Sequence, residues 1–180
     1  MPCIVFILLI YLLLSIKVEA LRTSYTVYLL TIFSFGFSGI AGDVMKEIFD
    51  RTRPFIEYAD QFTAITHPKT PSFPSGHATK SMALALPFVV FALHESWWNK
   101  LLRGIVLLTA LGVGYARIFL GAHYLSDVLA GIGLAIAGLP VAALVANRIT
   151  GRLCQERLNT MVKIWGIILF LLMLYLAFHS

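Results

Sequence analysis

Apolar stretches of nearly membrane-spanning length recur along the chain, with short polar stretches between them. A helix needs roughly 20 apolar residues to cross the hydrocarbon core of a bilayer. Six stretches come close to that length: residues 2–16, 25–46, 78–98, 101–119, 125–147 and 162–178. We therefore predict an all-α, polytopic membrane protein with a six-transmembrane-helix bundle. Trp97 and Trp98 are predicted to end the third helix in the interfacial zone where aromatic side chains gather.

The first stretch is shorter than the others and has the length of a secretory signal. No Lys or Arg precedes it, however, so we interpret it as a tilted or bilayer-thinning helix. No repeat, low-complexity tract or hydrophilic linker divides the chain, and 180 residues are few for two domains. A single membrane-embedded domain over residues 1–180 is the prediction.

Small residues and prolines inside the stretches predict how the helices pack. Glycine lets helix backbones approach closely in a membrane, and proline bends a helix. The glycines are Gly36, Gly39, Gly42, Gly112, Gly114, Gly131, Gly133 and Gly138, and the prolines are Pro87 and Pro140.

Composition excludes an ordinary soluble domain, because 59% of the residues are hydrophobic, 13% are charged and the mean hydropathy is +0.84. The net charge of +5 would also suit a nucleic-acid-binding protein. The topology instead assigns the excess of basic residues to one membrane edge, where they meet anionic headgroups. We therefore expect no nucleic acid, and we infer no obligatory protein partner.

Cys3 and Cys154 fall on opposite faces, which excludes a disulfide between them. Neither has a zinc-type ligand spacing, so no metal and no cofactor are expected.

Three polar motifs interrupt the apolar pattern. The first is Lys46 with Arg53 and Pro54, the second runs from Pro74 to His77, and the third consists of Arg117, His123 and Asp127. Successive connections between six spans alternate between the two faces of the membrane. All three motifs then fall on one face, after the second helix, before the third, and between the fourth and fifth.

The charge on each face predicts the orientation. The opposite face holds eight basic residues against three acids, and the motif face holds six basic residues against six acids. Basic residues favour the cytoplasmic side. The motifs and both termini are therefore predicted to face away from the cytoplasm.

The second motif joins a turn to the start of the third helix. Free N–H groups near Ser75 and Gly76, with the positive end of the helix dipole, can hold an anion. Ser75 could instead simply cap the helix, but a cap does not require His77. Lys46 and Arg53, taken alone, could be basic residues that reach the interface from a helix end.

The third motif combines a histidine and a carboxylate four residues apart. If the fifth helix starts near Ala122, His123 and Asp127 share a helical face, and the carboxylate can accept from one ring nitrogen. That bond fixes the tautomer and leaves the other nitrogen free to attack. The alternative is a buried polar cluster that ties helices together, although ionisable residues at membrane depth are costly to hold there without a function.

Together the motifs resemble the signatures of the type-2 phosphatidic acid phosphatase superfamily, the lipid phosphate phosphatases. The first reads Lys-x6-Arg-Pro, the second Pro-Ser-Gly-His, and the third matches Ser-Arg-x5-His-x3-Asp except that Ala116 replaces the serine. The resemblance spans residues 46–127, and the six predicted helices fit the membrane members of the family. Ala116 removes one possible hydrogen bond to phosphate or to a neighbouring side chain.

The resemblance implies a role for each motif residue. His123 would attack phosphorus and form a phosphohistidine, with Asp127 orienting it. His77 would protonate the leaving oxygen and later activate water. The equatorial oxygens would be neutralised, in place of a metal, by Lys46, Arg53, Ser75, Gly76 and Arg117.

The resulting expectation is a metal-independent membrane lipid phosphatase. Its substrate candidates are lipid A 1-phosphate, ranked first from the resemblance to small bacterial members, undecaprenyl diphosphate, phosphatidylglycerophosphate and phosphatidic acid. A lipid phosphotransferase and a catalytically silent lipid-binding or transport protein are the alternatives. The connection over residues 51–73 is interpreted either as a lid or as a segment resting on the membrane surface, and Arg51 is expected to pair with Asp50.

Overall fold

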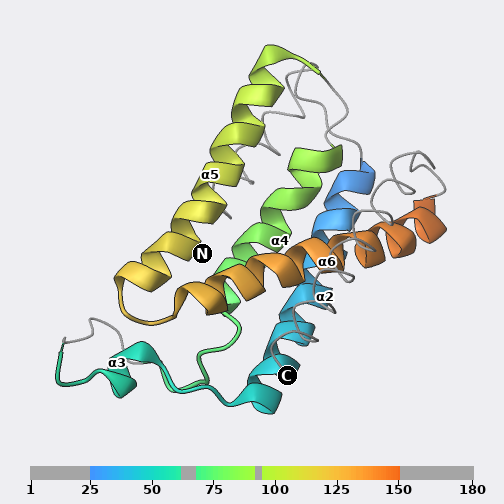
Figure 1. The fold of residues 1–180 in the computed structure, drawn as a ribbon. Helices are drawn as coiled ribbons and strands as arrows, with labels where there is room; N and C mark the ends of the chain where they lie inside the picture. Colours follow the sequence, from blue (N-terminus) through green and yellow to red (C-terminus); the bar gives the residue numbers. More distant parts are fainter. Residues whose placement is uncertain (1–24, 62–67, 92–94, 151–180) are drawn as a thin grey trace, which may run out of the picture.

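The computed structural model describes residues 25–61, 68–91 and 95–150. These residues form α2 (Tyr25–Phe49), α3 (Pro54–Glu57), α4 (Gly76–Phe91), α5 (Trp97–Phe119) and α6 (Leu125–Thr150) (Figure 1). The described part is all-helical, as predicted, and its four long helices correspond to the second to fifth predicted spans. The predicted first and sixth helices, with Cys3 and Cys154, lie outside the described residues.

The boundary between the third and fourth predicted helices was wrong. Trp97 and Trp98 do not end the third helix but begin α5. Ser96 explains the difference, because its side chain accepts a hydrogen bond from the Asn99 backbone N–H at 3.3 Å and so caps the helix. The predicted break between the two helices lay instead at Asn99 and Lys100, because tryptophan is common at either end of a span.

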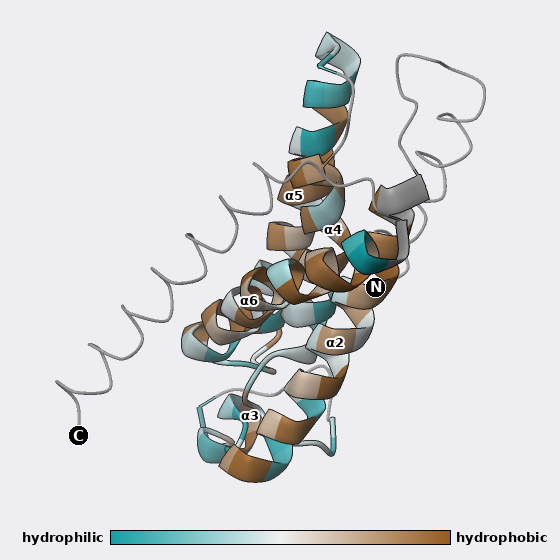
Figure 2. Ribbon diagram, turned by 90° about the vertical axis from the view of Figure 1, so that its right-hand side faces the viewer, coloured by the Kyte–Doolittle hydropathy of each residue, from teal (hydrophilic) through white to brown (hydrophobic). Residues whose placement is uncertain are grey.

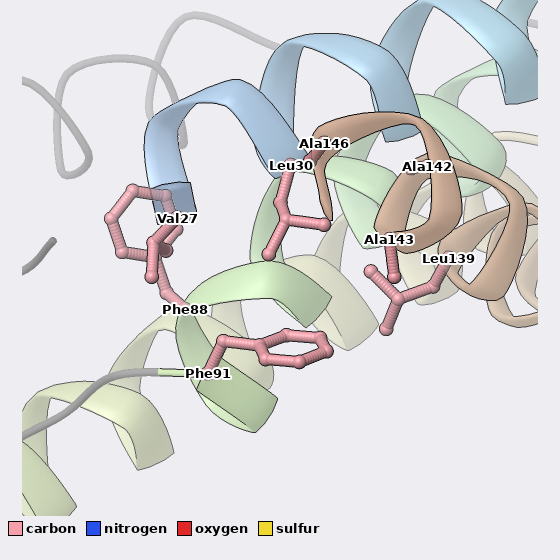
Figure 3. Close-up of a cluster of buried hydrophobic side chains, with 8 residues drawn as sticks. All are labelled: Val27, Leu30, Phe88, Phe91, Leu139, Ala142, Ala143 and Ala146. Atoms are coloured by element: carbon pink, nitrogen blue, oxygen red, sulfur yellow. The ribbon is translucent and has the colours of Figure 1, made fainter. Parts of the chain in front are cut away.

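Helix α4 is the central element of the bundle and packs against α2, α5 and α6 (Figure 1). On one side a buried cluster joins α2, α4 and α6, and Figure 3 shows its side chains meeting between the three helices. On the other side Met82, Ala83 and Ala85 of α4 meet Val106 and Ala110 of α5. These contacts fix the beginning of α4, where the second motif lies, relative to its neighbours.

Three glycines sit where helices approach most closely. A methyl group at Gly138 would lie 2.5 Å from Ser38 Oγ of α2, and one at Gly114 would lie 2.9 Å from Val128 Cγ1 of α6. Gly131 is equally close to α4. Around Gly36, Gly112 and Gly133 a methyl group would meet nothing within 4 Å among the described residues, so these glycines lie away from the contacts between α2, α4, α5 and α6. Pro87 and Pro140 lie inside α4 and α6.

Three segments of the described chain are long and apolar enough to cross a membrane: Leu29–Glu57, Trp97–Phe119 and Leu125–Arg148. Many of their exposed side chains are large and apolar, such as Ile40 at 69%, Leu108 at 69% and Phe119 at 77% exposure. Figure 2 shows apolar residues along these helices and hydrophilic residues gathered near α3 and at the start of α5. An exposed apolar surface of this kind suits lipid contact, and the chain is a multi-pass membrane protein.

Candidate active site

The end of α2, the beginning of α4 and the α5–α6 connection surround one cavity of about 530 Å³. Six of the eight predicted site residues contribute to its wall: Lys46, Arg53, Gly76, His77, Arg117 and His123. The other two, Ser75 and Asp127, are fully buried and bond to or contact this group. The fold thus brings together side chains that are up to 81 positions apart between Lys46 and Asp127.

His123 lies in the turn between α5 and α6, two residues before α6 begins. Gly121 adopts φ 64°, a conformation that favours glycine, and the backbone N–H of His123 then donates to Arg117 O at 3.2 Å. Asp127 is in the first turn of α6, and its Oδ2 lies 3.5 Å from His123 Nδ1. The predicted helix start near Ala122 was three residues early, but the two side chains still face each other.

Two side chains and one backbone N–H that the sequence analysis did not assign to the site hold the Asp127 carboxylate. Arg51 Nη1 donates to Oδ1 at 2.8 Å, so Arg51 pairs with Asp127 and not with Asp50 as expected. Ser72 Oγ donates to Oδ2 and lies 3.5 Å from His123 Nδ1. The Tyr124 backbone N–H adds a third donor at 3.0 Å. A fully buried carboxylate needs such compensation.

Arg53 ties the 50–75 connection to the nucleophile candidate. Its guanidinium donates to Thr70 O at 2.7 Å and to Ala122 O at 2.8 Å, and its Nη1 lies 3.2 Å from His123 Nε2. The side chain is only 4% exposed. Arg53 therefore already bonds the chain on both sides of the cavity, a structural role that the motif alone does not indicate.

Lys46 has a similar second role. Its ammonium group donates to Pro71 O at 3.1 Å and to Pro74 O at 2.7 Å while it lines the cavity. An ammonium group has three donors. Two of them fix the turn that leads into α4, and one is left for an anion.

The second motif forms the start of α4. Ser75 Oγ accepts from the Ala78 backbone N–H at 3.5 Å, and the Ser75 backbone N–H donates to Asp127 O at 2.9 Å. The α4 N-terminus is thereby bonded to the start of α6. Gly76 and His77 line the cavity at the positive end of the α4 dipole, an arrangement that favours a bound anion.

Arg117 reaches the cavity from the last turn of α5. Its Nε is buried and has no hydrogen-bond partner among the described residues. A buried donor without a partner is costly, and an anion in the cavity would satisfy it. The neighbouring Ala116 has no side-chain donor, so it supplies none of the hydrogen bonds that a serine could.

Burial lowers the pKa of His123 below its ordinary value, since a charged imidazolium is disfavoured away from water. The bond to Asp127 raises the pKa, but the cations of Arg53 and Lys46 oppose it. His123 is therefore neutral near pH 7. With Nδ1–H directed at Asp127, the lone pair is on Nε2, which lies 3.2 Å from Arg53 Nη1.

No group of three His, Cys, Asp or Glu side chains suited to a metal ion occurs in residues 25–61, 68–91 and 95–150. The charged groups that line the cavity are chiefly cations, which bind phosphate oxygens and not divalent metals.

Comparison with known proteins gives consistent matches. Phosphatidylglycerophosphatase B of Bacillus subtilis is 32% identical over 113 residues, which are 60% of this chain and 52% of that protein. Lipid A 1-phosphatase of Rhizobium etli is 36% identical over 121 residues, which are 64% of this chain and 48% of that protein. The chain spans about half the length of these relatives.

A solved structure matches as well. The crystal structure of a transmembrane PAP2 type phosphatidylglycerolphosphate phosphatase from Bacillus subtilis superposes with a TM-score of 0.57 and 25% identity, covering 83% of this chain and 71% of that one. The sequence profile of the PAP2 superfamily matches residues 26–151, which hold all three motifs and the four long helices. The chain belongs to the PAP2 superfamily.

Proposed function

We propose that the protein is a metal-independent lipid phosphatase that works through a phosphohistidine at His123. The observation that carries the proposal is the arrangement around the imidazole. Asp127 lies behind Nδ1, Nε2 lies 3.2 Å from Arg53 Nη1, and the ring lines a cavity together with Lys46, Arg53 and Arg117. A neutral, oriented nucleophile opposite converging cations is what phosphoryl transfer without a metal requires.

The reaction would proceed in two displacements. His123 Nε2 forms a bond to phosphorus while the bond from phosphorus to the lipid oxygen breaks, and His77 gives that oxygen a proton. Water then attacks the phosphohistidine, His77 takes the proton, and phosphate leaves with His123 restored. His77 lines the same cavity as His123, so one group can serve both half-reactions. The α4 N-terminus and Arg117 would stabilise the charge on the transferring oxygens.

The test is phosphate release by the purified protein in detergent with excess EDTA. The panel contains lipid A 1-phosphate, undecaprenyl diphosphate, phosphatidylglycerophosphate and phosphatidic acid, and the names of the relatives support the choice. His123→Ala should lower the rate by at least about a thousand-fold. Leu108→Ala, a change on the exposed face of α5, should leave it near wild type.

Other results would overturn parts of the proposal. Activity that disappears in EDTA and returns with Mg²⁺ would contradict metal independence. Transfer of phosphate to an added lipid without release would favour the phosphotransferase. Binding of the lipids without turnover would favour a silent lipid-binding or transport protein.

The site would open at the extracytoplasmic face of the bacterial inner membrane, in keeping with the charge distribution.

A further inference from the structure

The cavity is too large and too long for one phosphoryl group. Its volume is about 530 Å³, and one water occupies roughly 30 Å³. The cavity could therefore hold more than ten waters, which is far more room than a single phosphoryl group needs. Along α2 its lining includes Lys46, Asp43 and Phe35, and 11 residues of helix extend about 16 Å. The cavity therefore runs from the phosphate site inward between α2 and α4, the direction in which the tail of a membrane lipid would lie.

Lys80 lines this inner part of the cavity and belongs to none of the three motifs. It follows His77 by three residues on α4, so the two side chains are neighbours on one helical face. Its stem lies across from α2, where its Cε would be 3.5 Å from a methyl group placed on Gly39. Gly39 is about two helical turns inward from Lys46.

Lys80 differs from Lys46, Arg51 and Arg53 in having no partner among the described residues, as does Arg117 Nε. Lys46 and Arg53 donate to backbone carbonyls, and Arg51 pairs with Asp127. Within the described residues Lys80 takes part in no ion pair and no hydrogen bond. A half-buried ammonium group beside an apolar bundle is costly to hold without an anion, so its position suggests one.

The charge of the wall supports a second anionic group. Four cations line the cavity, Lys46, Arg53, Lys80 and Arg117, against the single carboxylate of Asp43. Three of the cations are already assigned to the phosphoryl group that is transferred. The fourth lies next to His77, the proposed acid for the leaving oxygen, and thus on the side of the leaving group.

We propose that Lys80 binds a second phosphate that stays on the lipid, which makes lipid diphosphates the preferred substrate class of this site. The inference rests on the proposed function. In the first step the bond between the terminal phosphorus and the bridging oxygen breaks as the bond to His123 Nε2 forms. The bridging oxygen leaves with the lipid monophosphate, whose new charge Lys80 stabilises. Water then releases inorganic phosphate. A monophosphate ester leaves as an alcohol and gains little from this cation.

The experiment compares a prenyl diphosphate with the prenyl monophosphate of the same chain length. Lys80→Gln removes the charge, Lys80→Arg keeps it, and Lys100→Gln makes the matched change at an exposed lysine at the start of α5. Lys80→Gln should lower kcat/KM for the diphosphate about 10- to 100-fold, as expected for one charge-assisted hydrogen bond, and that for the monophosphate less than about three-fold. Lys80→Arg should stay near wild type on both, and Lys100→Gln should change neither.

A second measurement needs no lipid. Methylenediphosphonate should inhibit the wild type more strongly than inorganic phosphate does, and Lys80→Gln should remove that difference. Equal losses on both lipids, an unchanged diphosphate rate, or a wild type that cleaves only the monophosphate would each overturn the role of Lys80 and leave the phosphatase proposal standing. A wild type that cleaves neither lipid, nor any in the panel above, would overturn both.

Discussion

At the scale of single residues, the proposed attack by His123 depends on the protonation state of its imidazole. A protonated imidazole has no lone pair at Nε2, so attack requires the neutral ring. Burial lowers the pKa of His123, which extends the neutral form to lower pH than for a histidine in water. The pH dependence of kcat/KM reports the ionisation of groups in the free enzyme. We therefore expect the midpoint of its acid limb to lie below pH 6.5, the ordinary pKa of histidine.

Ser72 offers a way to move that limb. Its hydroxyl donates to Asp127 Oδ2, which is also the carboxylate oxygen that faces His123 Nδ1. Ser72→Ala removes the donor, leaves the carboxylate more attractive to the imidazolium, and so raises the pKa of His123. We expect the acid limb to move to higher pH and kcat/KM below pH 6 to fall about ten-fold. The measurement is a pH profile of kcat/KM.

Two variants separate this effect from a general loss of structure. Ser72→Thr keeps the hydroxyl and should restore the wild-type profile. Ser81→Ala removes another buried serine hydroxyl, one that bonds the Ala78 and Ala110 carbonyls, and should leave the limb in place. A Ser72→Ala profile that is lower at every pH but not displaced would mean that Ser72 serves folding and not the histidine.

Single residues also show the limit of reading the site from sequence. The motif spacing predicted that His123 and Asp127 face each other. They do, although His123 precedes α6 and is placed by the turn at Gly121 and not by the helical repeat. The spacing could not show that Arg53 and Lys46 bond the carbonyls of Thr70, Pro71 and Pro74, since every residue has a carbonyl and nothing in the sequence marks these. Ser72 was missed because its hydroxyl bonds Asp127 across 55 positions of the chain and no motif marks it.

At the scale of helices, the site depends on how closely α6 approaches α4. A methyl group at Gly131 would lie 2.7 Å from Thr79 Oγ1 and 2.8 Å from Ser75 O. Both belong to the start of α4, so Gly131→Ala must displace the turn that carries Ser75 and His77. Overpacking of this kind costs roughly 1–3 kcal/mol, and small displacements of reacting groups are costly in rate. We expect kcat/KM to fall at least about ten-fold, with a lower Tm in detergent.

Gly133 provides the matched control on the same helix. A methyl group there meets nothing within 4 Å among the described residues, and alanine is the better helix former by about 1 kcal/mol. Gly133→Ala should therefore keep full activity and an equal or higher Tm. If Gly131→Ala behaved like Gly133→Ala, the close contact between α4 and α6 would not position the site.

The helices themselves were largely predictable, and their ends were not. Apolar runs gave α2, α5 and α6 because lipid contact demands long apolar segments. The Trp97–Trp98 pair was assigned to the wrong helix, since tryptophan suits either end of a span and the Ser96 cap is a local hydrogen bond. Among the glycines, only the three-dimensional crossing distinguishes Gly131 from Gly133.

At the scale of the whole molecule, the two ends of the bundle differ in the side chains that they carry. The site and α3 lie at one end, and the beginning of α5 lies at the other (Figure 1). Lys100 and Arg103 at that far end, with Arg148 near the end of α6, are basic. Because basic residues stay in the cytoplasm, the site end is expected on the other side of the membrane, where it would meet lipids of the outer leaflet.

Cysteine labelling in intact cells tests this orientation. In a chain with Cys3 and Cys154 changed to serine, Asp60→Cys places a thiol in the exposed segment after α3, and Lys100→Cys places one at the exposed start of α5. A membrane-impermeant maleimide should label position 60 in intact cells and position 100 only after the membrane is opened. The paired positions control for each other, because an exposed thiol that reacts only after lysis is cytoplasmic. Labelling of position 100 alone would invert the topology and place the phosphatase site toward lipids of the inner leaflet.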